Sequence, residues 1–397
     1  NKIYNVARAG IFLGFEENTT VTGNRIYNIP GVEGASTAGI LLGGQARTGH
    51  YGYNNINLNI TANEISQLYS SSDVYGVCNE QVSFELTQPN NAKIRFPNVA
   101  ESITIANNSI WGLIPSNSTA NRVGVRVFTE RNAAQSTAFA RMTTPKVATY
   151  QTRNDVIANN TIVMDGDANT VNTGMVAGVM AQQTFGATVM NNAIAILDND
   201  IATDNSLSAG IVYNGTAPAA NSILINNNAY DMSAAVDLVR YIQTDNAANV
   251  IAPGSKGEFK NIEQWIARTG QDKQSVVSNF RDDLTYLGSA PQKLRVKSNP
   301  IPIGSVLNNR GVALPTVTND IDGDTRGAAN QRFDIGADEF SGRLYINDAE
   351  IVRFTYPMQY KASIGEFSDA EYTMTIAPVD VKVLVRNNGS ATKSQLP

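Results

Sequence analysis

The chain has 397 residues and a formal net charge of −5, and only 16% of its residues are charged. No basic cluster occurs, which argues against nucleic acid or an acidic membrane surface as a partner. No apolar run reaches membrane-spanning length, and a single cysteine, Cys78, excludes an intrachain disulfide framework. Sparse charge with abundant Asn, Thr, Ser and Gly is typical of extracellular bacterial β-rich proteins.

From residue 1 to about residue 230 the chain repeats a short pattern. An asparagine follows an apolar strand-like run, and an isoleucine-like residue stands two positions after that asparagine. A glycine followed by a β-branched residue comes later in each repeat, as at Gly39-Ile40 and Gly76-Val77. The asparagines assigned to the repeat are Asn1, Asn24, Asn63, Asn108, Asn160, Asn199 and Asn228.

This repeat predicts an all-β solenoid in which each turn of the chain stacks on the next. Apolar residues alternate with polar ones on either side of the asparagine, which indicates strands with one buried face. We expect each asparagine to take a left-handed corner and to hydrogen-bond its counterpart in the next turn. The glycine marks a second corner or bulge that needs positive φ or close packing. Parallel stacking of about three strands per turn predicts a parallel β-helix, and the general bias of parallel crossovers predicts that it is right-handed.

The coils are expected over residues 1–250. The repeats differ in length, and the excess falls mainly in three insertions, at about 43–56, 79–101 and 128–154. Because these insertions follow the same part of each repeat, we expect them to leave from one side and to lie next to one another. The chain opens inside a repeat, so we expect it to belong to a longer multidomain protein.

Residues 251–340 are predicted to close the solenoid. The spacing of Phe259, Ile262, Trp265 and Ile266 predicts one short helix over 259–269, with Gly270 as its C-terminal residue. Short strands and turns follow, and two motifs close the region. These motifs are the run Asp320-Ile321-Asp322-Gly323-Asp324-Thr325-Arg326 and the run Asp334-Ile335-Gly336-Ala337-Asp338-Glu339-Phe340.

Together the repeats, the segment from Trp265 to Asp272 and the two closing motifs resemble secreted bacterial parallel β-helix repeat proteins of the pectate-lyase-like fold. The resemblance covers about residues 1–340. The resemblance implies an extracellular or bacterial cell-surface location. The chain resembles in particular the surface proteins of Bacteroidota that the type IX pathway exports. That family includes adhesins, structural proteins and polysaccharide-active enzymes, so the resemblance specifies the fold more closely than the activity.

Residues 341–397 change character. Ile351 and Phe354, and later Val381, Val383 and Val385, alternate like sandwich strands, and a turn follows at 387–390. The run from Val379 to Gly389 looks like the start of a bacterial Ig-like adhesion module. Since an Ig-like sandwich takes about 100 residues, we expect a linker and an incomplete Ig-like domain here.

Candidate catalytic residues are sparse. The position two residues after the repeated glycine is mostly apolar, as in Leu41, Cys78 and Met180, so we expect that face to be covered. The best acid–base candidates are Arg126 and Glu130 beside the large insertions, as a lyase or hydrolase would need. The single histidine, His50, has no evident partners for a triad or a zinc site, and Cys78 is interpreted as a packing residue.

Two further sets of residues could bind ligands. Tyr4, Tyr27 and Trp111 stand three residues after ladder asparagines and would form an aromatic row, either for flat sugar faces or as packing under a loop. Asp320, Asp322 and Asp324 alternate around Gly323, and such oxygen ligands suit Ca²⁺. Turn hydrogen bonds with pairing to Arg326 or Arg332 would explain the same aspartates without a cofactor.

These patterns favour a non-enzymatic structural or adhesive protein of the cell surface. Its expected partners are polysaccharides, other surface proteins or a secretion and anchoring machinery. A polysaccharide lyase or glycoside hydrolase, and a carbohydrate-binding module, are the alternative interpretations.

Overall fold

The computed structural model describes residues 1–14, 16–43, 55–80, 85–87, 93–95, 100–128, 145–146, 152–165, 174–182, 184–197, 208–214, 223–232, 237–242, 258–259, 262–288, 291–327, 332–342, 349–356 and 382–387. These residues form an all-β structure in which parallel sheets predominate and helix is scarce. The all-β prediction is therefore confirmed.

Three sheets form the body of the molecule, and their strands pair in parallel except for the last strand of the second sheet. Sheet I contains, in spatial order, β1 (Lys2–Tyr4), β4 (Arg25–Ile29), β7 (Glu64–Ser70), β13 (Ser109–Pro115), β18 (Thr161–Met164), β22 (Ala193–Ile196), β25 (Ala229–Met232) and β28 (Val276–Val277). Sheet II contains β2 (Ala9–Leu13), β5 (Thr37–Gly43), β8 (Val74–Glu80), β14 (Arg122–Phe128), β19 (Val176–Gln182), β23 (Ala209–Asn214), β26 (Asp237–Ile242) and β27 (Glu258–Phe259). Sheet III contains β3 (Thr20–Thr22), β6 (Asn59–Thr61), β12 (Thr104–Ala106), β17 (Val156–Ala158), β21 (Ala187–Met190) and β24 (Ile223–Asn226).

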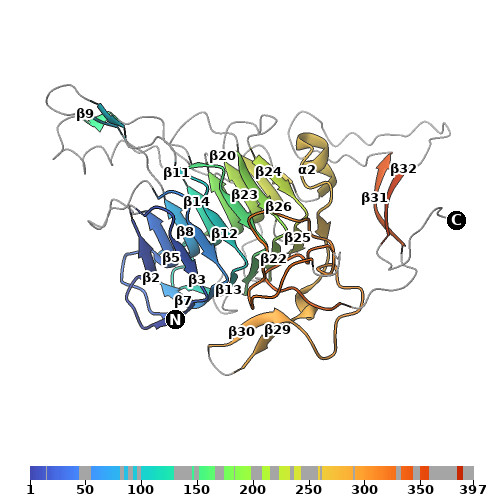
Figure 1. Cartoon of the computed structure of the whole chain (residues 1–397), viewed down its shortest axis with the longest axis horizontal. Helices are drawn as coiled ribbons and strands as arrows, with labels where there is room; N and C mark the ends of the chain where they lie inside the picture. The colour runs from blue at the N-terminus through green and yellow to red at the C-terminus, as the bar shows by residue number, and fades with distance from the viewer. Residues whose placement is uncertain are drawn as a thin grey trace.

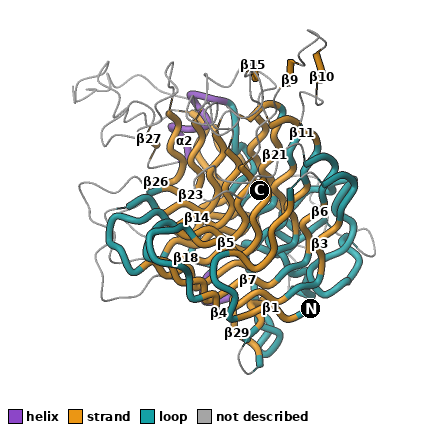
Figure 2. Tube along the Cα trace, turned by 90° about the vertical axis from the view of Figure 1, so that its left-hand side faces the viewer, coloured by secondary structure: helices purple, strands orange, loops and turns teal. Residues whose placement is uncertain are grey.

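The chain passes from sheet I to sheet II to sheet III and then returns to sheet I, repeatedly in that order. One such passage is called a circuit below. Successive circuits advance from the blue strands at one end to the yellow strands near α2 at the other (Figure 1). Figure 2 shows the strands in the body of the molecule and many of the loops along its margins. Equivalent residues pair in register, so that Ile26 lies opposite both Ile3 and Ile65.

One apolar core fills the space between the three sheets. Each sheet contributes a row of inward side chains, such as Ile65 and Ile110 from sheet I, Val77 from sheet II, and Ile60 and Ile105 from sheet III, all 0% exposed. Burial of each such side chain stabilises the fold by about 1.5–3 kcal/mol. The period-two alternation of the sequence therefore has its physical origin in this shared interior.

The corner between sheet III and sheet I carries a continuous ladder of asparagine side chains. The Nδ2 of Asn108 donates to Oδ1 of Asn160 (3.0 Å) and to the carbonyl oxygen of Ile60 (2.8 Å). Its Oδ1 accepts from Nδ2 and from the backbone N–H of Asn63, both at 3.0 Å. Each inner amide thus has its donors and acceptors satisfied away from water. The ladder runs through Asn1, Asn24, Asn63, Asn108, Asn160, Asn192 and Asn228.

The structure corrects the sixth member of the predicted ladder. Asn192, and not Asn199, stands between Asn160 and Asn228, with 3.0 Å and 3.1 Å to its neighbours. Asn199 lies outside the described residues. Both asparagines precede an isoleucine by two positions, so the motif alone does not choose between them. Strand pairing decides the register, because Ile194 pairs with Ile162 in sheet I.

The left-handed residue of the corner is the one before the ladder asparagine, which corrects a second expectation. Gly23, Ala62 and Asn107 have φ of 66°, 55° and 57°, whereas the ladder asparagines that follow them have no positive φ. The ladder asparagine must already be extended, because its own N–H donates to the next Oδ1 while it enters sheet I.

The repeated glycine of sheet II is required by close packing. A Cβ on Gly39 would lie 2.4 Å from Cγ2 of Ile65 and 2.7 Å from the carbonyl oxygen of Gly76. Gly76 meets Ile110 and Gly124 in the same way at 2.5 Å. These glycines have no positive φ, so of the two explanations left open by the sequence, close packing holds.

The second and third predicted insertions pair with each other. β9 (Glu85–Thr87) is flanked by β10 (Lys93–Arg95) and β15 (Pro145–Lys146) in an antiparallel sheet. A small parallel sheet joins β11 (Ala100–Glu101), β16 (Thr152–Arg153) and β20 (Thr184–Phe185). The described strands of these two insertions are therefore neighbours. Most of the first insertion, 44–54, lies outside the described residues.

The predicted helix is present and closes the interior core. It forms α2, Ile262–Thr269, and starts later than expected because Phe259 belongs to β27, antiparallel to β26. Trp265 is fully buried in the core. Gly270 ends the helix with φ of 71°, and its N–H donates to the carbonyl oxygen of Ile266.

Asp272 terminates the asparagine ladder. Its carboxylate accepts from Nδ2 of Asn228 (3.4 Å), Nε1 of Trp265 (2.9 Å) and the hydroxyls of Tyr230 and Ser275. A carboxylate has no N–H to pass on, so the donor chain of the ladder ends here. Burial raises the pKa of Asp272.

A C-terminal cover, residues 276–340, follows the ladder end. It includes β28, a 3₁₀ turn at Arg281–Asp283 and the hairpin of β29 (Leu284–Leu287) with β30 (Lys293–Val296). Phe280, Leu294 and Ile335 of the cover pack against outward residues of sheet I such as Trp111 and Val163. Beyond the cover, β31 (Ala349–Tyr356) pairs antiparallel with β32 (Lys382–Asn387). The Ig-like module stays a prediction.

We expect Asn108→Ala to lower the free energy of unfolding by about 3–5 kcal/mol, because four ladder hydrogen bonds are lost and buried partners are left unpaired. The measurement is chemical denaturation of the purified chain. The control is Asn59→Ala, at an exposed asparagine of sheet III. Equal stability of the two variants would contradict the role given to the ladder.

Asn79 is a buried asparagine outside the ladder, and its replacement should raise stability. It is 0% exposed, and within the described part of the chain neither its Nδ2 nor its Oδ1 has a hydrogen-bond partner. Its register partners Leu42 and Val127 belong to the apolar core. Asn79→Leu should therefore raise the free energy of unfolding by about 1–3 kcal/mol. A lower denaturation midpoint would show that the amide serves the fold.

Candidate functional site

The outer face of sheet I is divided into an exposed part and a covered part. On the first two circuits Lys2, Tyr4, Arg25 and Tyr27 point outward, and the third circuit begins the area under the C-terminal cover. The rings of Tyr4 and Tyr27 stack with centroids 5.2 Å apart and an interplanar angle of 21°. Tyr4 is 51% exposed. The structure thus brings together two of the three aromatic side chains that were predicted to bind a ligand.

Trp111, the third predicted aromatic, belongs to the covered part. It is 6% exposed, and the ring of Tyr286 lies over it at 5.9 Å between centroids. Tyr286 is fixed by a hydrogen bond to Asp165 (2.9 Å), and burial raises the pKa of Asp165. Ser66 separates Trp111 from Tyr27 in the register of sheet I. Trp111 is therefore a packing residue under the cover and does not belong to the candidate site.

A chain of ion pairs marks the border between the two parts. Arg295 of β30 contacts Glu64 of β7 at 2.6 Å and Asp322 at 2.6 Å, and Lys293 contacts Asp322 at 3.1 Å. Arg295 lowers the pKa of Asp322 to about 2. The pKa of Glu64 is raised, since burial outweighs the attraction of Arg295. Sequence reasoning missed Glu64 and Arg295 because only the fold brings them together.

The predicted calcium ligands have other uses. Oδ1 of Asp320 accepts the backbone N–H of Asp322 and of Asp324 at 2.9 and 2.8 Å, and its Oδ2 accepts the N–H of Glu339. Asp322 turns to Arg295, and Asp324 is exposed. Across the described residues, no three His, Cys, Asp or Glu side chains come together as metal ligands. The turn hydrogen bonds of the alternative are present, but the arginine that pairs with these aspartates is Arg295 and not Arg326 or Arg332.

Arg326 instead anchors the cover to the corner of the stack. Its guanidinium donates to Oδ1 of Asn107 (2.7 Å), to the carboxylate of Glu339 (2.9 Å) and to the carbonyl oxygens of Gly336 and Ala337. Asp334 accepts the N–H of Phe340 close by, and burial together with Glu339 raises the pKa of Asp334 to about 8.

The cover is held along an outer asparagine row, defined as Asn107, Asn159, Asn191 and Asn227. Their Nδ2 atoms donate to backbone carbonyl oxygens of Asn319, Asp334, Val312 and Arg310 respectively. Each member directly precedes a ladder asparagine. The sequence signal for the attachment of the cover is a pair of consecutive asparagines at each of these corners. The first two corners lack this pair, because Gly23 and Ala62 precede their ladder asparagines.

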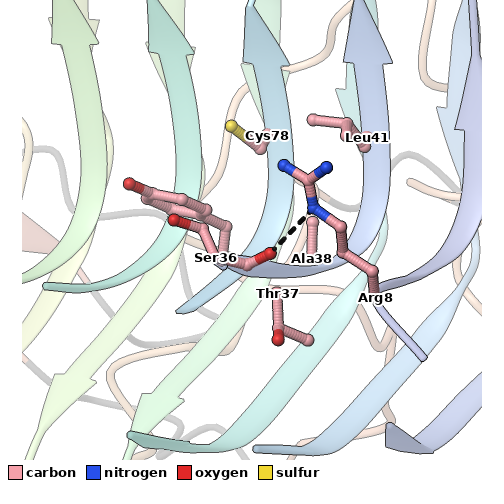
Figure 3. A pocket seen from close by; sticks show the side chains of 7 residues that line it. Arg8, Ser36, Thr37, Ala38, Leu41 and Cys78 are labelled. Carbon is pink, nitrogen blue, oxygen red and sulfur yellow. Dashed lines mark hydrogen bonds between the residues drawn. The ribbon is translucent and has the colours of Figure 1, made fainter. Parts of the chain in front are cut away.

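On the outer face of sheet II the predicted apolar row is present and becomes buried along the stack. Phe12 is 41% exposed, whereas Cys78 and Val212 are 1% and 0% exposed. Cys78 packs there, as expected. A small pocket on this face is lined by Arg8, Ser36, Thr37, Ala38, Leu41, Tyr75 and Cys78, and Nε of Arg8 donates to the carbonyl oxygen of Ser36 at 3.3 Å (Figure 3).

The catalytic candidate Arg126 lies on the same face. Its Nη1 donates to the hydroxyl of Tyr75 (2.9 Å), its guanidinium stands 5.0 Å from the centre of the Tyr75 ring, and Tyr75 in turn donates to Asp73 (2.8 Å). Glu130 and His50 lie outside the described residues. The geometry gives Arg126 a fixed position through Tyr75, while its pairing with Glu130 stays a prediction.

Comparisons with family models, curated proteins and solved structures give no match to this chain. None of the helices in the described ranges combines the length and the hydropathy needed to span a membrane.

The cover should be sensitive to pH through Asp338. Burial raises the pKa of Asp338 to about 7, and its Oδ2 accepts the N–H of Val296 at 2.9 Å. Because the folded-state pKa lies above the unfolded value, the stabilisation is present in acid and is lost as pH rises from about 4 to about 7. Asp338→Asn keeps an acceptor but does not ionise. Its melting temperature should exceed that of the parent at about pH 9 and match it at about pH 4, and a parallel pair of curves would refute the assignment.

Proposed function

We propose that this chain is a right-handed parallel β-helix that acts as a stiff scaffold of a secreted or cell-surface bacterial protein, with a structural or adhesive role. The observation that carries the proposal is the asparagine ladder. It joins successive circuits through satisfied, buried amides and ends at Asp272 beneath the closing helix. Such a stack adds length by repetition, and each circuit contacts mainly its neighbours.

The right-handed winding is supported by the order of the sheets and by the general handedness of parallel crossovers. Location at the bacterial surface, export by the type IX pathway and a following Ig-like module are parts of the same proposal. They are supported by the resemblance of the repeats and of the closing motifs, while the β31–β32 pair is compatible with the start of a sandwich.

An adhesive scaffold should bind a surface without altering it. The experiment applies fluorescently labelled purified chain to bacterial cells and to immobilised polysaccharides, and assays the same polysaccharides for new chain ends. We expect retention on at least one surface and no new ends. Release of products that disappears with Arg126→Ala or Glu130→Ala would instead establish the lyase or hydrolase alternative.

A carbohydrate-binding role is the second candidate, and the exposed Tyr4–Tyr27 stack favours it. Aromatic side chains present apolar faces and edges that suit the C–H surfaces of sugars.

A further inference from the structure

A five-residue run that differs only by Lys for Arg is repeated in the exposed part of sheet I. The first two circuits read Asn1-Lys2-Ile3-Tyr4-Asn5 and Asn24-Arg25-Ile26-Tyr27-Asn28. The ladder explains Asn1 and Asn24, and the core accounts for Ile3 and Ile26. Asn5 and Asn28 occupy left-handed positions, with φ of 55° and 53°, which asparagine tolerates. The fold does not require the remaining agreement, in which a cation and a tyrosine recur at the same outward positions. The two cations, the two tyrosines and these two asparagines are called the exposed shelf: Lys2, Tyr4, Asn5, Arg25, Tyr27 and Asn28.

In the covered circuits, the positions equivalent to Lys2 and Tyr4 hold residues that pack against the cover. In the third circuit they hold Glu64 and Ser66, and Glu64 pairs with Arg295. In the fourth they hold Ser109 and Trp111. Ser109 donates to the carbonyl oxygen of Leu294 (3.3 Å), and Trp111 packs under Tyr286. The cation–tyrosine pattern therefore ends where the cover begins.

The charges of the shelf are unfavourable for folding by themselves. Lys2 and Arg25 are direct register partners in neighbouring parallel strands, and like charges side by side in a sheet are destabilising. On its other side Arg25 faces Glu64 and is attracted by it, but this single carboxylate also contacts Arg295 at 2.6 Å, so it serves more than one cation. Two cations are thus held together on a protein whose net charge is −5. An anionic ligand would offset their repulsion.

We propose that the exposed shelf binds an anionic polysaccharide. The paired cations would contact its sulfate or carboxylate groups, the Tyr4–Tyr27 stack would contact the apolar faces of its sugar rings, and the amides of Asn5 and Asn28 would bond its hydroxyls. Asn28 already donates to Asn5, which fixes these two amides at the edge of the tyrosine stack. A cation beside an aromatic group in each of two circuits matches a ligand with regularly repeated charges, as in a polymer of charged sugars.

This inference names the ligand class for the proposed adhesive role and rests on it only for its biological setting. Binding is measured on the purified full chain by biolayer interferometry, with dextran, carboxymethyl dextran and dextran sulfate as immobilised probes. We expect binding to one or both charged dextrans and none to neutral dextran, with weaker binding at higher salt. Preference between the two charged probes separates carboxylate from sulfate as the recognised group.

Variants then locate the site. Arg25→Ala, Lys2→Ala and Tyr27→Ala should each weaken binding by about tenfold. Lys273→Ala makes the same change of charge at an exposed site of the described chain remote in sequence from the shelf, and Phe12→Ala removes an exposed ring from sheet II; both should bind like the parent. Thermal melting of every variant shows that it is folded.

Equal losses in Arg25→Ala and Lys273→Ala would show non-specific charge binding and overturn the proposal. So would equal binding of neutral dextran, failure of both charged dextrans to bind, or stronger binding to an acidic peptide such as polyglutamate. In any of these cases adhesion to cells by the labelled chain would still stand as separate evidence for the scaffold role.

Discussion

The buried amide ladder is the constraint on which the structure depends. An unpaired amide inside a protein is costly, so each inner ladder asparagine requires hydrogen-bond partners in the circuits on either side. Asn108, for example, makes four hydrogen bonds to Asn63, Asn160 and Ile60. This requirement fixes the register of all three sheets at once, because a shift of one residue would break the ladder and turn the isoleucine rows out of the core. Asp272 can end the ladder because it only accepts.

The same corner performs a second task through the residue that precedes each ladder asparagine. The left-handed conformation required there is met by glycine at Gly23 and by asparagine at Asn107, both with positive φ. Asparagine has an additional use, since its side chain points outward and bonds the cover, as Asn107 does with Asn319 and Arg326. Local backbone geometry and long-range docking are therefore satisfied by one residue type.

Where the cover lies determines what the rest of sheet I can do. The aromatic row of the sequence is divided at the ion pair of Glu64 and Arg295. Trp111 becomes part of the packing, whereas Tyr4 and Tyr27 stay at the surface beside Lys2 and Arg25. The proposed scaffold and the proposed binding shelf thus belong to the same sheet, and the cover separates them.

By itself the sequence determined the all-β class, the repeat, six of the seven ladder asparagines and the helix that ends at Gly270. These features depend on periodicity and on local backbone preferences, which neighbouring residues encode. Tertiary structure alone decided the choice of Asn192, the conversion of Asp320 and Asp322 from apparent metal ligands into turn and ion-pair partners, and the burial of Trp111. Each of these depends on contacts between residues far apart in the chain, in the extreme the 219 positions between Asn107 and Arg326, and no local pattern records which distant groups will meet.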